Sequence, residues 1–231
     1  MSRNANIKPT SHSRGGDGSR GFTLIELLSV IAVMTVMMVT VLPAFTGIRG
    51  AGNVTKVAYD VAGTLEQARS YAMANNTYVF VGFTERDGLN AANPGSGQIL
   101  VAAMGSKDGT RKFDASNLVA LSKLRRFENM HLEDSLPNSG AMTRPAVQDF
   151  NRVGNDAFQA DGAFTVSGQE FKKIIQFDPR GTASVQSGTA SIPHWMEIGL
   201  VAAKGGAVVG KSNCAALVLD GVTGSAKIYR P

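Results

Sequence analysis

The sequence predicts an α+β protein in which one long N-terminal helix, membrane-spanning in its first half, packs on an antiparallel β-sheet. Three observations support this fold class. A run of 19 residues without charge covers 27–45, apolar residues then recur at helical spacing over 54–72, and short β-type runs alternate with turn residues from 77 onward. The length of 231 residues is typical of one or two domains.

Composition and charge indicate a folded chain without a strong electrostatic preference for nucleic acid. The chain is 43% hydrophobic and 18% charged, which argues against disorder through most of its length. The formal net charge is +5, and the first 21 residues supply +3 of it through Arg3, Lys8, Arg14 and Arg20 against Asp17. The remaining +2 is weak evidence for a nucleic-acid partner.

The residues of common catalytic and metal sites are sparse. Cys214 is the one cysteine, so an intrachain disulfide and a structural zinc site are both excluded, and its apolar neighbours predict a buried thiol. The histidines, His12, His131 and His194, belong to no H-E-x-x-H pattern, and the chain contains no G-x-S-x-G motif. We therefore expect no enzyme activity, no cofactor and no metal.

The uncharged run over 27–45 has the length of a membrane span. As a helix it would measure about 28 Å, close to the hydrocarbon core of about 30 Å. Residues 1–20 are polar, basic and rich in Gly and Ser, which predicts an unstructured cytoplasmic N-terminus and a translocated C-terminal part. A secretory signal peptide and a plain single-pass anchor are alternatives, although "LPAFTG" offers no clean cleavage site. Neither alternative explains Gly21, Phe22 and Glu26.

The stretch "GFTLIELL" at 21–28 resembles the N-terminal signature of type IV pilins and type II secretion pseudopilins. The resemblance implies that a prepilin peptidase cuts between Gly21 and Phe22, removes the leader 1–21 and methylates Phe22. Glu26 becomes the acidic fifth residue of the mature chain, and Pro43 stands where many members have a proline that bends the helix. The implied division is then 22–46 for the transmembrane half of a spine helix, 47–76 for its amphipathic half, and 77–231 for a periplasmic head with an insertion at about 137–170.

Glu26 is costly near a membrane span unless it has a use. A carboxylate one turn from a helix N-terminus is favoured by the helix dipole. In a filament, Glu26 of one subunit could pair with the Phe22 amine of a neighbour and so fix the register between packed helices. The alternative is a lone glutamate that reaches to the membrane interface. The resemblance implies as partners the prepilin peptidase, other pilins, an inner-membrane assembly platform and membrane lipid.

Residues 54–72 predict an amphipathic helix. Its apolar face consists of Val54, Val57, Ala58, Val61, Leu65, Ala68 and Ala72. Gly47, Gly50 and Gly52 weaken the junction before it by up to about 1 kcal/mol each, which predicts a bend or a local break there. The helix is expected to end near 75–76.

The remainder predicts strands joined by turns. The expected β-type runs are 77–83, 98–104, 172–185, 194–203, 215–220 and 225–230. The run 118–127 is ambiguous between strand and helix, and 146–153 is a candidate short helix within the insertion. "GVTG" at 221–224 is a hairpin signal.

Several motifs of this half resemble the H/FimT-like branch of minor pseudopilins. They are the Ala-Arg helix end in "LEQARSYAMANN", the F-x-P-x-G turn formed by Phe177, Pro179 and Gly181, and a terminal hairpin that holds Thr223 and Gly224. Together with the N-terminal signature they cover most of the chain outside the insertion.

"GGAVVGKS" at 205–212 fits the phosphate-loop pattern through Gly205, Gly210, Lys211 and Ser212, so a nucleotide-binding protein is a remote alternative. The pattern requires a strand before the loop and a helix after it. Here a β-rich run follows, and only 19 residues remain after Ser212. We expect Lys211 on a solvated loop.

The leading interpretation is therefore a structural one: a minor subunit of a type II secretion pseudopilus or type IV pilus-like filament. It would be a single-pass inner-membrane protein with a cytoplasmic N-terminus and a periplasmic head, and would then join the filament. The alternative is a DNA-binding minor pilin for DNA uptake, with contacts from Lys204, Lys211, Lys227 and Arg230. Solvated lysines that protect strand edges would explain the same residues.

Overall fold

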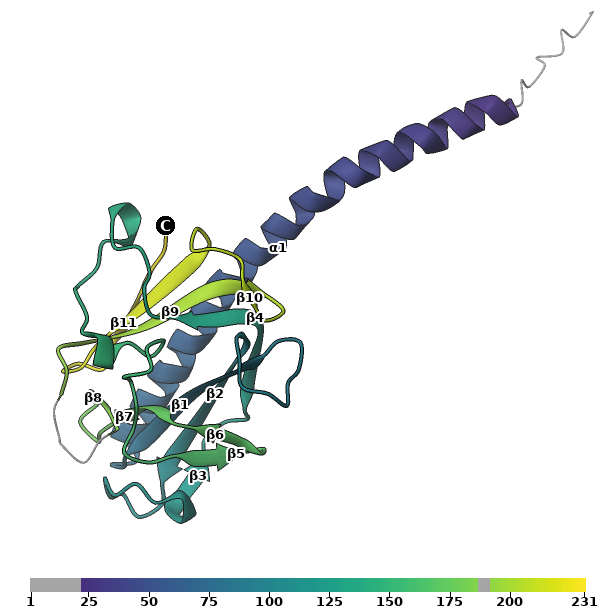
Figure 1. Ribbon diagram of the computed structural model, residues 1–231. Coiled ribbons are helices and arrows are strands. Elements are labelled where there is room, and N and C mark those ends of the chain that lie inside the picture. Colours follow the sequence, from purple (N-terminus) through teal and green to yellow (C-terminus); the bar gives the residue numbers. More distant parts are fainter. Residues whose placement is uncertain (1–21, 187–191) are drawn as a thin grey trace, which may run out of the picture. The chain divides into compact units, whose positions relative to one another are not determined.

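The computed structural model describes residues 22–186 and 192–231; within the helix, the side chains of 39–53 are not described. The chain forms two compact units, Met1–Phe45 and Thr46–Pro231. We call the second the globular unit. It combines the C-terminal part of a helix with a large antiparallel sheet, so the predicted α+β class is confirmed (Figure 1).

Helix α1 extends over Leu24–Ala74. Of the bend or local break expected at Gly47, Gly50 and Gly52, the break is wrong, because these residues are helical, and the bend stays a prediction. An interrupted helix would have two additional ends and would need a second nucleation step. The free-energy cost of these exceeds the helix-propensity penalty of about 1 kcal/mol per glycine. Searched over the described residues alone, α1 contains no stretch that is both long and apolar enough to cross a membrane.

The predicted apolar face of 54–72 is confirmed, since all seven of its residues are buried in the globular unit. The helix ends as expected: Asn76 adopts a left-handed conformation (φ 48°), and the Thr77 amide donates to the Ala72 carbonyl at 3.0 Å. This is a Schellman ending, in which Asn replaces the more common Gly. The chain then turns directly into the first strand.

Within residues 22–186 and 192–231, ten strands form one sheet in the order β12-β11-β9-β4-β2-β1-β7-β8, with β10 beside β9 and β3 beside β2, while β5 and β6 form a separate hairpin. The strands are β1 (Val79–Asp87), β2 (Gly97–Ser106), β3 (Leu118–Ala120), β4 (Arg125–Glu133), β5 (Phe164–Val166), β6 (Gln169–Phe171), β7 (Lys173–Phe177), β8 (Ala183–Val185), β9 (Trp195–Lys204), β10 (Ala207–Val208), β11 (Cys214–Asp220) and β12 (Ala226–Tyr229). The 3₁₀ turns are η1 (Ala115–Asn117), η2 (Gly140–Met142) and η3 (Asp149–Asn151).

Each expected strand has a counterpart in the sheet, and the ambiguous run 118–127 is extended, in β3 and the start of β4. The candidate helix at 146–153 is wrong, because only the single 3₁₀ turn η3 forms there. Pro145 precedes this run and Gly154 follows it, so an α-helix would have had little length in which to develop.

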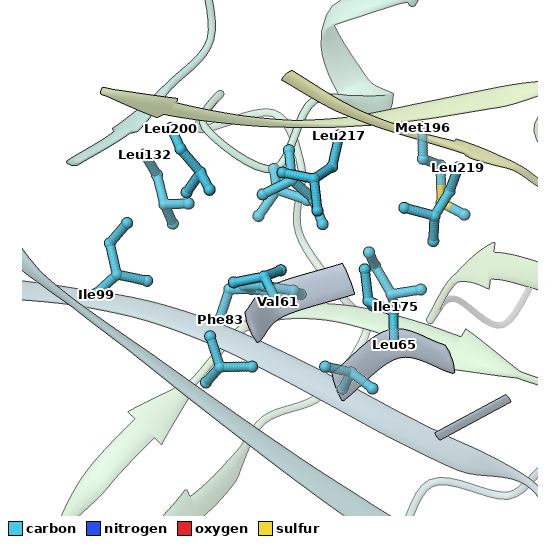
Figure 2. Close-up of a cluster of buried hydrophobic side chains, with 14 of the residues drawn as sticks. Val61, Leu65, Phe83, Ile99, Leu132, Ile175, Met196, Leu200, Leu217 and Leu219 are labelled. Atoms are coloured by element: carbon cyan, nitrogen blue, oxygen red, sulfur yellow. The ribbon is translucent and has the colours of Figure 1, made fainter. Parts of the chain in front are cut away.

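The sheet curls around α1. At Asn129 (φ 57°) β4 carries a bulge, since Gln98 pairs with Glu128 and Gly97 with Met130. Such a bulge bends a strand and increases its twist. Figure 2 shows the result: side chains of β4, β9 and β11 point toward those of α1, β1, β2 and β7 in one core. The two ends of the sheet also meet, because the Ala183 amide of β8 donates to the Gly221 carbonyl after β11 at 2.7 Å.

The outer face of the sheet is covered by the β5–β6 hairpin and by a loop. Phe164 and Phe171 stack at 5.1 Å over β1 and β7. A Cβ at Gly82 would lie 2.5 Å from the Phe164 ring, so this strand position requires glycine. Further along, Leu136 and Met142 cover β9 and β11. Part of the segment 137–170 therefore packs on the sheet.

A buried ion pair fixes this loop to the sheet. Arg144 donates from Nε and Nη2 to the two carboxylate oxygens of Glu197 on β9, both at 2.9 Å, and both side chains are at most 3% exposed. The remaining guanidinium hydrogens reach the carbonyls of Leu136, Pro137 and Met142. The pair thus has the bidentate geometry and additional hydrogen bonds that a buried charge requires.

A half-buried histidine adds a pH-dependent contact between β4 and β1. His131 Nδ1 lies 2.9 Å from Glu85 Oε1, and the same oxygen accepts the Leu132 amide. The hydrogen bond to Glu85 raises the pKa of His131 above its ordinary value of 6.5, although burial opposes the shift. The protonated imidazole therefore stabilises the fold below that value, and the contribution is lost as the pH rises through the folded-state pKa.

We expect the free energy of unfolding to fall as the pH rises above 6.5 and through the raised pKa of His131, by a component that His131→Gln and Glu85→Gln both remove. His194→Gln, a change at an exposed histidine, should retain that component. Chemical denaturation across this range measures it. The same pH dependence in the wild type and in His131→Gln would contradict the assignment.

Candidate functional site

The start of α1 is built as a capping box. Thr23 stands at the N-cap, where its Oγ1 accepts the Glu26 amide at 3.3 Å, and Glu26 Oε2 accepts the Thr23 amide at 3.2 Å. The Thr23 hydroxyl also lies 3.2 Å from Oε2. This reciprocal pattern satisfies two amides that no helical carbonyl can reach. Its sequence signal is the pattern T-x-x-E directly before an apolar run, which this chain carries at 23–26.

The capping box leaves part of the Glu26 carboxylate available. Within the described part of the chain, both side-chain bonds of Glu26 use Oε2, and Oε1 accepts none. Phe22, the residue before the cap, is 82% exposed. A cation beside this turn could therefore pair with Oε1 without disrupting the cap, and the helix dipole favours the carboxylate there in either case.

The helical turns behind this cap are apolar on every side. We call residues 22–38 the N-terminal apolar segment. Its large apolar side chains are all at least 47% exposed: Phe22, Leu24, Ile25, Leu27, Leu28, Val30, Ile31, Val33, Met34, Val36, Met37 and Met38. A helix that is apolar all round is normally covered by other helices or by lipid.

The hydroxyls of this segment are consistent with an apolar environment. Ser29 Oγ donates to the Glu26 carbonyl and Thr35 Oγ1 to the Ala32 carbonyl, both at 2.8 Å. Each hydroxyl thereby finds its partner on the same helix, as a polar group in hydrocarbon requires.

Not all of the predicted processing and assembly residues are described. Gly21 lies outside the described residues. Pro43 belongs to α1, but its side chain is not described, so the predicted bend stays a prediction. Phe22 and Glu26 lie together at the helix start, with Thr23 as the residue that sequence reasoning missed.

The four residues considered for DNA contact do not share one surface. Lys227 lies over the Tyr229 ring at 5.1 Å, on the sheet face that carries Leu136 and Met142. Arg230 reaches the other face, where it donates to Thr55 Oγ1 of α1 and, at 3.1 Å, to Asn213 Oδ1. Three positions apart in an extended chain, the two cations are expected on opposite faces.

The other two cations of that set differ in their surroundings. Lys211 Nζ donates to the carbonyl and the hydroxyl of Ser135, both at 2.8 Å, and lies 3.3 Å from Glu133 Oε1. Lys204 is exposed at the end of β9. These four cations therefore do not form one continuous row.

The phosphate-loop match at 205–212 lacks the structure that the motif requires. It follows β9, contains β10, and leads at Cys214 into β11 rather than into a helix. A phosphate loop depends on the N-terminus of the following helix to hold the phosphates. Cys214 itself is fully buried, as predicted, and burial raises the pKa of its thiol.

One comparison with known proteins bears on the N-terminus. The family model "Prokaryotic N-terminal methylation motif" matches residues 17–42, which include the capping box and the whole N-terminal apolar segment. The match supports a type IV pilin-like protein, and the motif implies processing by a prepilin peptidase and assembly with other pilins. No curated protein and no solved structure matches the chain.

Proposed function

We propose that the chain is a minor structural subunit of a type II secretion pseudopilus or a type IV pilus-like filament, and that it catalyses no reaction. The observation that carries the proposal is the methylation motif at 17–42 together with the capped, apolar helix start that it covers. An exposed apolar helix with a carboxylate in its first turn is suited to packing against copies of itself or its relatives.

Processing would prepare this helix start for assembly. A cut between Gly21 and Phe22 would place a positively charged, methylated amine one residue before the N-cap Thr23. Glu26 of a neighbouring subunit would offer Oε1 to that amine while Oε2 still holds its own cap. In a low-dielectric bundle, an unpaired amine or carboxylate is costly, so only the register that joins them is stable.

The proposed division of the chain follows from this role. The leader 1–21 is removed, 22–46 anchors the protein in the inner membrane, 47–76 forms the packed half of the spine, and 77–231 is the periplasmic head with its insertion at about 137–170. Prepilin peptidase, the other filament subunits and an inner-membrane assembly platform are the proposed partners.

We further propose the H/FimT-like branch. Its supporting motifs lie against one another at the C-terminal end of α1. A Cβ at Gly181 of the F-x-P-x-G turn would lie 2.7 Å from Met73 Sδ, and a Cβ at Gly224 would lie 2.1 Å from the Gly181 carbonyl. Both glycines have positive φ, at 84° and 66°, and both lie close to Arg69. Side chains at either position would separate the turn, the hairpin and the helix end.

Deletion of the gene in the native cell tests the proposal. Protein secretion, surface motility and DNA uptake are scored together, with re-expression of the wild-type chain as the control. We expect a loss of one or more of these activities, and the pattern of loss identifies the machine. All three activities at wild-type level would contradict a role in any such filament.

A further inference from the structure

Two loops meet at one end of the globular unit. The loop 88–96 between β1 and β2 contacts the turn between β9 and β10, where Ser96 Oγ donates to the Gly206 carbonyl at 2.6 Å. Leu89 packs on the same turn, since a Cβ at Gly205 would lie 2.9 Å from Leu89 Cδ2. Segments more than 100 positions apart in the sequence therefore form one joint surface.

This surface presents apolar side chains to solvent on a well-held backbone. Leu89 is 84% exposed and Val209 is 61% exposed, and Val208 beside it is 40% exposed. Asp87 Oδ1 accepts the Leu89 amide at 2.7 Å, and the Val209 amide donates to the Ala202 carbonyl at 3.0 Å. Local hydrogen bonds of the Leu89 and Val209 amides thus fix the backbone from which these side chains reach into solvent. The two side chains are not part of the hydrophobic core.

A series of hydrogen bonds places this surface at the end where the chain enters the globular unit. Val209 bonds to Ala202, the Ala202 amide donates to the Asn213 carbonyl at 3.4 Å, and the Asn213 side chain accepts from Arg230. Arg230 in turn donates to Thr55, within the first buried turns of α1. We call the surface formed by Leu89, Val208, Val209, Lys56 and Lys204 the entry end.

The entry end carries two exposed lysines, Lys56 and Lys204, and the half-buried Arg230. Asp60 and Glu128 line the same shallow depression as Lys56, so the charge around that lysine is mixed. The carboxylate of Asp87 also lies here, but it accepts the backbone amides of Leu89 and Asn90. Exposed apolar tips among lysines are typical of surfaces that lie on an anionic bilayer, where apolar side chains enter the interface and lysines face the headgroups.

We propose that the entry end rests on the anionic lipid surface of the membrane that anchors the chain, with Leu89 and Val209 in the interfacial layer. This inference rests on the proposed anchoring by residues 22–46. Lipid accounts for both observations, the apolar tips and the lysines. A nucleic acid would use the lysines alone, because its outer surface is phosphate. The contact would hold the head against the bilayer until extraction into a filament removes it.

Site-specific fluorescence tests the contact in the full chain. Val209→Cys and, as a matched control, Val222→Cys are each labelled with an environment-sensitive dye and reconstituted into vesicles of phosphatidylethanolamine and phosphatidylglycerol. Val222 is 63% exposed in the turn at the other end of β11. Cys214 stays unlabelled, because it is buried and its thiol pKa is raised. Nitroxide-bearing lipids are expected to quench the label at 209 at least about twofold more than the label at 222.

The outcomes separate this inference from the proposed function. Chain that does not float with the vesicles would contradict the anchoring, and the inference with it. Chain that floats but shows equal quenching at 209 and 222 would contradict the inference alone. A label at 209 that responds to added duplex DNA and not to lipid would identify nucleic acid as the occupant and overturn the lipid contact.

A charge substitution provides a second, independent readout. Lys204→Gln should lower the quenching at 209 in vesicles that contain phosphatidylglycerol and leave it unchanged in vesicles of phosphatidylcholine alone. Lys227→Gln is the control, since this lysine lies over Tyr229 on the outer face of the sheet. Equal effects of the two substitutions would show that only net charge matters and would contradict a contact at the entry end.

Discussion

Replacement of Glu26 by alanine is expected to leave the precursor cleaved and inserted in the membrane, but to reduce its incorporation into filaments by at least about 100-fold. Removal of one partner from a buried ion pair costs about 3–5 kcal/mol, because the other charge is left without compensation. The amine of Phe22 would be that uncompensated charge in the packed filament. Incorporation is measured as the share of the subunit in the sheared filament fraction relative to the membrane fraction.

Glu26→Gln separates the charge from the cap. Glutamine at this position of a capping box still accepts the Thr23 amide, so the helix start should persist. It lacks the negative charge that a neighbour's amine requires, so we expect Glu26→Gln to assemble as poorly as Glu26→Ala. Thr23→Ala is the converse control, since it weakens the cap by about 1 kcal/mol and keeps the charge. Normal assembly of Glu26→Gln would show that Glu26 serves the cap alone.

Replacement of Arg144 by methionine is expected to destabilise the globular unit by about 3–5 kcal/mol. The substitution would leave Glu197, at 2% side-chain exposure, as an unpaired carboxylate beneath the loop that carries Leu136 and Met142. For a unit of this size, that cost lowers the midpoint of thermal unfolding by about 6–20 °C. Thermal unfolding of the full chain in detergent, followed by circular dichroism in the β region, measures it.

Two controls isolate the buried pair. The double variant Arg144→Met with Glu197→Met removes both charges and should recover most of the lost stability, because apolar replacements of a buried pair are often nearly neutral. Lys172→Met breaks the exposed pair with Glu170, whose side chains are more than half exposed, and should change stability by less than about 1 kcal/mol. If Arg144→Met lowers the stability as little as Lys172→Met does, the buried ion pair of Arg144 with Glu197 does not fix the loop to the sheet.

The periodic parts of the fold could be predicted from the sequence, because their signals are local. The apolar face from Val54 to Ala72 is indicated by helical spacing, and the strands β1 and β2 by short apolar runs between turn residues. The curl of the sheet could not be predicted from the sequence, because it depends on the bulge at Asn129 and on contacts between distant segments. The pair of Arg144 with Glu197 joins positions 53 apart, and neither residue stands in a pattern that indicates its partner.

The candidate site was predictable to a similar degree. Gly21, Phe22 and Glu26 stand in a short motif, so the sequence alone indicates them. The capping bonds of Thr23 also have a local signal, the T-x-x-E pattern at 23–26, which sequence reasoning missed. The basic residues near the C-terminus were grouped by their closeness in sequence. Side chains alternate between the two faces of a strand, so Lys227 and Arg230, three positions apart, lie on opposite faces. This separation could have been predicted from the sequence alone.

The mass of the protein extracted from membranes of the native cell tests the central claim most directly. Processing by a prepilin peptidase predicts the mass of residues 22–231 plus one methyl group, with the methyl group on the Phe22 amine in the N-terminal fragment. A Gly21→Leu variant should retain the leader and serve as the unprocessed reference. A mature chain that begins at any residue other than a methylated Phe22 would contradict the proposed processing, and with it the pairing of Glu26 with a neighbour's amine.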